Sequence, residues 1–183
     1  MRLLTIGLVS LTVTGCGYNR IQTLDEQVNG YKGQIEVQLQ RRGDLVPNLV
    51  ETVKGYAKHE DSVFTKVAEA RARLGGAVQS GSLPQMADAN QALNGALGRF
   101  IAIAEAYPQL RANENFKSLQ DQLEGTENRI ATARSDYNAS VQTYNAYIRQ
   151  FPQVLTAKAI GKQAREYFEV TGADQREVPA VKF

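Results

Sequence analysis

The chain has 183 residues, of which 43% are hydrophobic and 22% charged, an ordinary composition for a globular protein with one core. Its formal net charge of +2 gives no electrostatic argument for nucleic-acid binding. With one cysteine and one histidine, the sequence excludes an intrachain disulfide and offers almost no ligands for a metal centre. We therefore expect neither a nucleic-acid partner nor a cofactor.

The first fifteen residues are typical of a bacterial secretory signal. A basic Arg2 precedes an uncharged apolar run at residues 3–13, which is shorter than the ~20 residues that a membrane-spanning helix needs. The only cysteine follows in Val13-Thr14-Gly15-Cys16, which resembles a bacterial lipobox, where the thiol receives diacylglycerol and a peptidase cuts before the cysteine. We expect removal of residues 1–15 and lipidation at Cys16. Two or three acyl chains at that residue would anchor the protein stably.

Two alternatives remain for this segment: a plain signal peptide with an incidental cysteine, and an uncut signal-anchor. The lipobox interpretation places the protein on a membrane, facing the periplasm or the cell exterior. An Asp directly after the lipidated cysteine would favour retention in the inner membrane. Gly17 stands at that position, which favours the outer membrane if the organism has one.

After a short tether at residues 16–22, the first helix is expected to begin at Thr23, which forms a capping-box pattern with Glu26. Apolar residues then recur at steps of three and four as far as Tyr56, which predicts an amphipathic helix. Pro47 interrupts this pattern, so the helix either kinks near Gly43 or ends there and restarts with Asp44 as N-cap. The unbroken phase of the stripe favours one kinked helix.

Four more helical patterns follow in the chain. They begin near Asp61, with Pro84 in a first turn, near Asn113 as N-cap, and after Pro152, the last with Leu155, Ile160, Tyr167 and Phe168 as its apolar positions. The long patterns predict an all-α fold, an elongated antiparallel four-helix bundle over residues 23–170 with a short C-terminal helix. Residues 171–183 are expected to be a polar tail.

Several charged residues fall on or beside the predicted apolar stripes. The structural polar candidates are Arg42, Asp44, Glu127 and Arg134. Buried charge persists only when it is paired, so we expect at least one arginine, Arg41, Arg42 or Arg134, to pair across helices with Glu127, Glu124 or Asp44. The alternative is that all of them are solvated. A paired layer would fix helix register rather than bind a ligand.

Long collinear stretches resemble the LemA family over about residues 20–152. They are Leu39-Gln-Arg-Arg-Gly-Asp-Leu-Val-Pro-Asn-Leu-Val50, residues 52–60, Ala70-Arg71, residues 105–108, 113–116 and 123–130, Ala133-Arg134, and Tyr137-Asn138 to Phe151-Pro152. The resemblance implies a helical bundle outside the cytoplasm on a membrane tether, with no established catalytic activity or cofactor. Most members of that family are similar to proteins with an uncut spanning helix, so the lipobox is a departure.

No catalytic constellation is present in the sequence. His59 has Tyr56 three residues before it, which fails the Glu-x-x-His pattern of a di-iron bundle, and no serine lies in a Gly-x-Ser-x-Gly elbow. We therefore expect a non-catalytic, lipid-anchored scaffold that binds an unidentified envelope protein. The alternatives are a membrane-contacting protein, with lipid contact at residues 154–168 through Lys158, Lys162 and Arg165, and an enzyme with a site in a bundle cleft.

Overall fold

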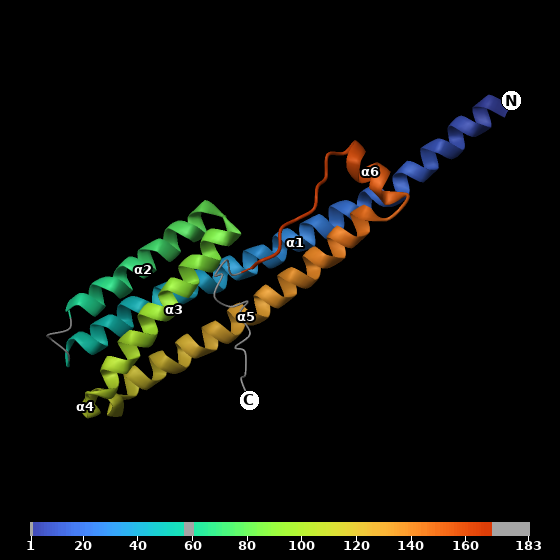
Figure 1. The fold of residues 1–183 in the computed structure, drawn as a ribbon. Helices are drawn as coiled ribbons and strands as arrows, with labels where there is room; N and C mark the ends of the chain where they lie inside the picture. The colour runs from blue at the N-terminus through green and yellow to red at the C-terminus, as the bar shows by residue number, and fades with distance from the viewer. Residues whose placement is uncertain (1, 57–60, 170–183) are drawn as a thin grey trace, which may run out of the picture. The chain divides into compact units, whose positions relative to one another are not determined.

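The predicted all-α fold is confirmed by the structure, a computed structural model that describes residues 2–56 and 61–169, with side chains from Gly17 onward except that of Glu105. These residues form six helices and no strand (Figure 1). The helices are α1 (Arg2–Lys54), α2 (Asp61–Ser80), α3 (Leu83–Glu105), α4 (Pro108–Ala112), α5 (Glu114–Arg149) and α6 (Gln153–Ala159).

The described chain divides into two compact units. Unit 1 comprises residues up to Ile35 together with Ala131–Tyr167, and unit 2 comprises Glu36–Ile130 with Phe168 and Glu169. Helices α1 and α5 each contribute one part of their length to each unit.

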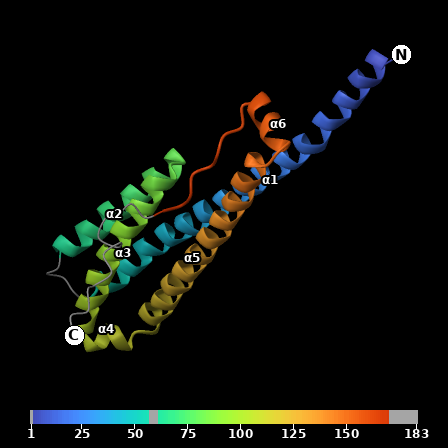
Figure 2. The same ribbon diagram turned by 45° about the vertical axis from the view of Figure 1, so that its right-hand side comes forward.

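Unit 2 contains the four-helix arrangement expected from the sequence. In it α2 and α3 form an antiparallel hairpin, and the parts of α1 and α5 in this unit run in opposite directions (Figures 1 and 2). Its core is made by one apolar stripe per helix, including Leu39, Leu49, Val67, Leu74, Leu93, Phe100, Leu123 and Ile130. Phe64 and Phe100 meet edge to face with ring centroids 5.7 Å apart, which joins α2 to α3.

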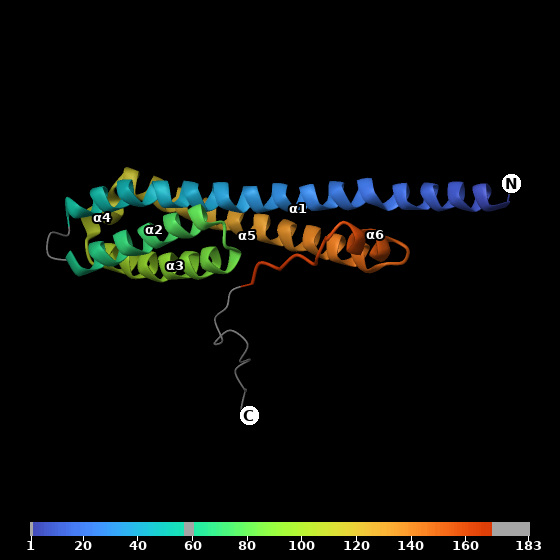
Figure 3. The same cartoon turned by 90° about the horizontal axis from the view of Figure 1, so that it is seen from above.

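Unit 1 is built on two long helical segments and the short helix α6. Figure 3 shows α6 lying beside the N-terminal part of α1 and the C-terminal part of α5. On α1 and α5 the buried side chains of this unit recur at helical spacing; they are Ile21, Leu24, Val28, Ile35, Ala133, Tyr137, Val141, Tyr144 and Ile148. On α6 the prediction is wrong, because Leu155 is 59% exposed and Ala157 is the buried residue.

Helix α1 continues through Pro47 without a break, so the chain does not restart at Asp44. Proline has no N–H, which leaves the carbonyl oxygen of Gly43 without its usual helical donor. The Nε atom of Arg71 in α2 donates to that oxygen at 2.9 Å. A side chain from the neighbouring helix thus replaces the missing backbone hydrogen bond.

The start of the first helix differs from the expectation. Residues 16–22 are helical rather than a tether, and Thr23 is not an N-cap, because its Oγ1 atom donates to the carbonyl of Asn19 inside the helix. Gly17 and Ile21 are both buried, so the apolar stripe begins before Leu24. Packing against the rest of unit 1 stabilises residues 16–22 as helix, although the local capping pattern alone predicted that the helix begins at Thr23.

The start of α5 agrees with the sequence. The Oδ1 atom of Asn113 accepts hydrogen bonds from the backbone N–H groups of Asn115 at 2.9 Å and Phe116 at 3.2 Å, which confirms it as an N-cap.

The last helix is shorter than expected, because α6 ends at Ala159. Gly161 has a φ of 70°, and the N–H of Lys162 donates to the carbonyl of Ala157 at 2.9 Å, which is the Schellman ending of a helix. Tyr167 and Phe168 therefore follow in a non-helical segment rather than on a helix. The expected tail at residues 171–183 lies outside the described residues.

Replacing Gly161 with alanine should destabilise the protein by about 1 kcal/mol, because alanine is strained at positive φ. The matched control is Gly98→Ala: Gly98 is exposed within α3, a Cβ there would meet nothing within 4 Å, and the change should stabilise by ~0.5 kcal/mol. Urea denaturation followed by circular dichroism measures both. Equal effects of the two changes would contradict the Schellman ending.

Candidate functional site

A buried polar layer joins three helices of unit 2. Arg42 on α1 is only 5% exposed, and its Nη1 atom donates to the Oδ1 atom of Asn90 on α3 at 2.8 Å. The same Nη1 atom forms an ion pair with Oε2 of Glu127 on α5. The other oxygen of Glu127 accepts from Nδ2 of Asn94 at 3.3 Å. We call these four residues the Arg42 layer.

The Arg42 layer contains one of the cross-helix pairs that the sequence predicts. Burial lowers the pKa of the Arg42 guanidinium, and the charge and hydrogen bond of Glu127 offset part of that effect. An arginine keeps its proton under these conditions, so the layer holds a buried cation against a carboxylate. This arrangement fixes how three helices align.

The other polar candidates lie elsewhere. Asp44 is exposed on α1, where its Oδ1 atom accepts from Nε2 of Gln40 at 3.1 Å. Arg134 is half-buried and belongs to unit 1. The backbone of Cys16 is part of α1, and its side chain is among those that the structure does not describe.

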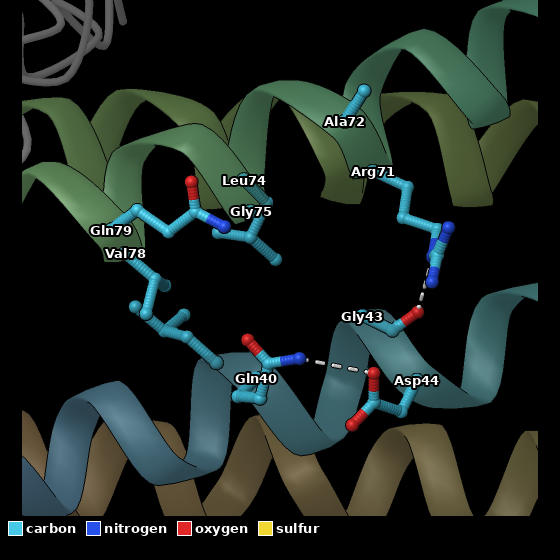
Figure 4. Close-up of a pocket in the computed structure, with 10 residues that line it drawn as sticks. Gln40, Gly43, Asp44, Arg71, Ala72, Leu74, Gly75, Val78 and Gln79 are labelled. Carbon is cyan, nitrogen blue, oxygen red and sulfur yellow. Dashed lines mark hydrogen bonds between the residues drawn. The ribbon is translucent and has the colours of Figure 1, made fainter.

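A cavity of about 220 Å³ lies between α1 and α2 in unit 2 (Figure 4). Its wall includes the Arg71 guanidinium bound to the Gly43 carbonyl and the Gln40–Asp44 hydrogen bond. The remaining lining residues are Leu39, Ala72, Leu74, Gly75, Val78 and Gln79. Its lining includes no hydroxyl, thiol or imidazole group, and its acidic side chain is that of Asp44.

Unit 1 contains a second polar cluster, which the sequence analysis did not find. Asp25 on α1 is 6% exposed; its Oδ2 atom accepts from Nζ of Lys162 at 2.6 Å, and its Oδ1 atom accepts from Nε and Nη2 of Arg165 at 2.9 and 2.7 Å. The side chain of Asn145 on α5 pairs with the backbone of Arg165, donating to its carbonyl at 2.9 Å and accepting from its N–H at 2.8 Å. We call these four residues the Asp25 clamp.

The Asp25 clamp holds the non-helical segment that follows α6. Tyr137 adds a further bond, because its hydroxyl donates to the carbonyl of Glu166 at 2.9 Å. Burial by itself would raise the pKa of Asp25, but the hydrogen bonds and charges of Lys162 and Arg165 outweigh it and lower that pKa below its ordinary value. One sequence signal could have revealed the clamp, since Asp25 lies on the buried stripe between Ile21 and Val28.

Within residues 2–56 and 61–169, no group of three or more metal-ligating side chains comes together. His59 lies outside these residues. In the same part of the chain, no helix has both the length and the hydropathy that crossing a membrane requires.

A sequence model of the LemA family matches residues 31–183. The magnetosome proteins MamQ 2 and MamQ 1 of Paramagnetospirillum magneticum are each 31% identical over 175 residues, which covers 83% of this chain and 64% of theirs. Magnetosome protein MamQ of Magnetospirillum gryphiswaldense is 32% identical over 174 residues, covering 82% of this chain and 64% of its own. The chain therefore spans less than two thirds of the length of these relatives.

Replacing Glu127 with glutamine should lower the free energy of unfolding by about 2 kcal/mol, because it leaves Arg42 buried without a counter-charge. The cost is less than that of a fully buried pair, since the Glu127 side chain is 37% exposed. Urea denaturation measures the change. Glu124→Gln, at an exposed position of the same helix, is the control and should change stability by less than about 0.5 kcal/mol. Equal effects would contradict a stabilising Arg42 layer.

The Asp25 clamp should make stability depend on pH in the acid range. The pKa of Asp25 is lower in the folded chain than its ordinary value of 3.8, so the unfolded chain takes up the proton first as pH falls. The contribution is therefore complete above pH 3.8 and is lost as pH falls from there through the folded pKa. Asp25→Asn should cost about 1–2 kcal/mol at pH 6 and flatten this dependence, as measured by urea denaturation between pH 6 and pH 2.5. Parallel pH curves for the two proteins would show that another group is responsible.

Proposed function

This chain belongs to the LemA family, and we propose that it is a member anchored by lipid on Cys16 that serves as a non-catalytic scaffold in the cell envelope, where it binds a protein partner. The single observation that carries the anchor is the position of the only cysteine. Cys16 ends an apolar run preceded by Arg2, within Val13-Thr14-Gly15-Cys16. Such a segment is typical of a bacterial lipoprotein signal.

The packing of Gly17 gives this anchor a specific geometry. A Cβ built on Gly17 would lie 3.5 Å from Cγ of Gln153 and 3.7 Å from Oγ1 of Thr156, so α1 contacts α6 one residue after Cys16. Acyl chains on Cys16 would therefore be joined to unit 1 without a flexible spacer. The body would be held directly at the bilayer surface, facing the periplasm or the cell exterior, and on the outer membrane in a diderm organism.

The two polar clusters support a role without catalysis. Arg42 and Glu127 are committed to each other, and Asp25 is committed to Lys162 and Arg165. Groups that pair helices in this way act in the packing of the protein, which supports a structural role for both clusters. The similarity to magnetosome proteins extends over most of this chain, so we infer that the shared body is an interaction module used at more than one location.

Substituting Cys16 with serine tests the anchor. Serine lacks the thiol that forms the thioether, so we expect a chain that retains residues 1–15 and carries no diacylglycerol. Mass spectrometry of the protein extracted from membranes measures both properties. Thr14→Ser is the matched control, since it keeps a small residue within the same box and should be processed normally. Unchanged mass and fractionation of Cys16→Ser, or cleavage at another bond, would contradict the anchor.

The scaffold role is tested in the same cells by cross-linking. A photoreactive residue at Val37, which is 62% exposed, should give a discrete protein adduct in the wild-type background and much less of it with Cys16→Ser. The same residue at buried Leu39 is the control and should give none, since Leu39 is 0% exposed. If Val37 and Tyr56, the exposed apolar positions of unit 2, both give no adduct, a protein-binding scaffold is contradicted.

A further inference from the structure

Unit 1 has an exposed apolar corner where α5 ends and α6 begins. We call residues 149–158 the α5–α6 corner. Phe151 is 80% exposed, the highest value among the large hydrophobic side chains of the described residues, and Leu155 is 59% exposed. Two such side chains a few residues apart form an unpartnered apolar surface.

Helix α6 has one packed face and one free face. Ala157 is 3% exposed, and Gln153 and Thr156 approach Gly17 of α1, so these positions form the packed face. Leu155 and Lys158 are exposed on α6 and form its outer face. The α5–α6 corner thus adjoins the residue that follows Cys16, as the ribbons of α6 and α1 in Figures 1 and 3 show.

The charge of this region has one sign. From Cys16, where the proposed lipidated chain begins, the sequence has no Asp or Glu at residues 16–24, and it has none at residues 137–165. Within the corner, Arg149 and Lys158 are exposed cations. Lys162 and Arg165, which the alternative of a membrane-contacting protein includes with Lys158, are paired with Asp25. Exposed aromatic and aliphatic side chains flanked by cations are the combination that binds the surface of an anionic bilayer.

We propose that the α5–α6 corner is a membrane-contact surface. Phe151 and Leu155 enter the headgroup region of the bilayer, and Arg149 and Lys158 bind the phosphates of anionic lipids. The inference rests on the proposed lipid at Cys16, because that anchor brings a bilayer to the corner. A protein partner is the other occupant that could cover these side chains, and the experiment below separates the two.

The experiment uses a single tryptophan as a reporter, since the sequence contains none. Full-length acylated protein with Phe151→Trp is reconstituted into vesicles of phosphatidylcholine and phosphatidylglycerol, with and without bromine on the acyl chains. We expect blue-shifted emission and at least a twofold loss of fluorescence with brominated lipid. Val37→Trp is the matched control in unit 2; it replaces another exposed apolar residue and should not be quenched.

The charge component is tested by removing the corner cations in the Phe151→Trp protein. Each of Arg149→Gln and Lys158→Gln should lower the ratio of quenched to unquenched tryptophan roughly fivefold in the presence of phosphatidylglycerol. In vesicles of phosphatidylcholine alone the two substitutions should have little effect. Equal effects in both lipids would overturn the assignment of these residues to anionic headgroups.

The other outcomes of the flotation and quenching measurements also support or overturn the proposed membrane contact. Protein that floats with vesicles while Phe151→Trp is unquenched would overturn it, and so would blue-shifted emission that brominated lipid does not quench, because protein would then cover the corner. Protein that carries no lipid and does not float would contradict the anchor on Cys16. In that case, quenching of Phe151→Trp on addition of anionic vesicles would still support the corner, and its absence would overturn it.

Discussion

Polar side chains interrupt the apolar helix stripes of both units, and the described structure depends on how most of them are paired, because burial of an unpaired polar group costs free energy. The buried polar and charged residues in this part of the chain are Asp25, Arg42, Asn90, Thr126 and Asn145. Thr126 is satisfied within its own helix, where its hydroxyl donates to the carbonyl of Leu123 at 2.7 Å. The other four belong to the Arg42 layer and the Asp25 clamp, one in each unit. Apolar stripes alone would allow helices to slide by a turn, whereas these pairs are satisfied in one alignment.

The Asp25 clamp also explains how a segment without secondary structure is held on unit 1. The amide of Asn145 donates to and accepts from the backbone of Arg165, as a neighbouring strand would. The side chains of Lys162 and Arg165 then converge on one carboxylate, so the segment is held through both its backbone and its charges. Gly161 makes this path available, because its positive φ turns the chain out of α6.

The sequence predicts the helices well, because each helix buries one stripe of apolar residues. The spacing of that stripe can be recognised without knowing which other helices it packs against. It also predicts Asn113 as a cap. A charge on a core position demands a counter-charge, so the sequence predicts that one of three arginines pairs across helices with one of three acids, and Arg42 and Glu127 form such a pair. It fails at Thr23, because a capping pattern shows what a residue can do and tertiary packing decides whether it does so. It fails at the Asp25 clamp, because Asp25 and Lys162 are 137 positions apart and no local pattern links them.

A scaffold at a membrane needs a defined orientation as well as an anchor. A lipid on Cys16 alone would hold unit 1 at one point and leave it free to rotate about that point. Contact through Phe151 and Leu155 would add a second point, and the packing of Gly17 against α6 keeps the two points close and rigidly connected. Because Asp25 offsets the charges of Lys162 and Arg165, the proposed contact relies on Arg149 and Lys158. The same carboxylate that folds the segment after α6 would thereby define which surface of unit 1 faces the bilayer.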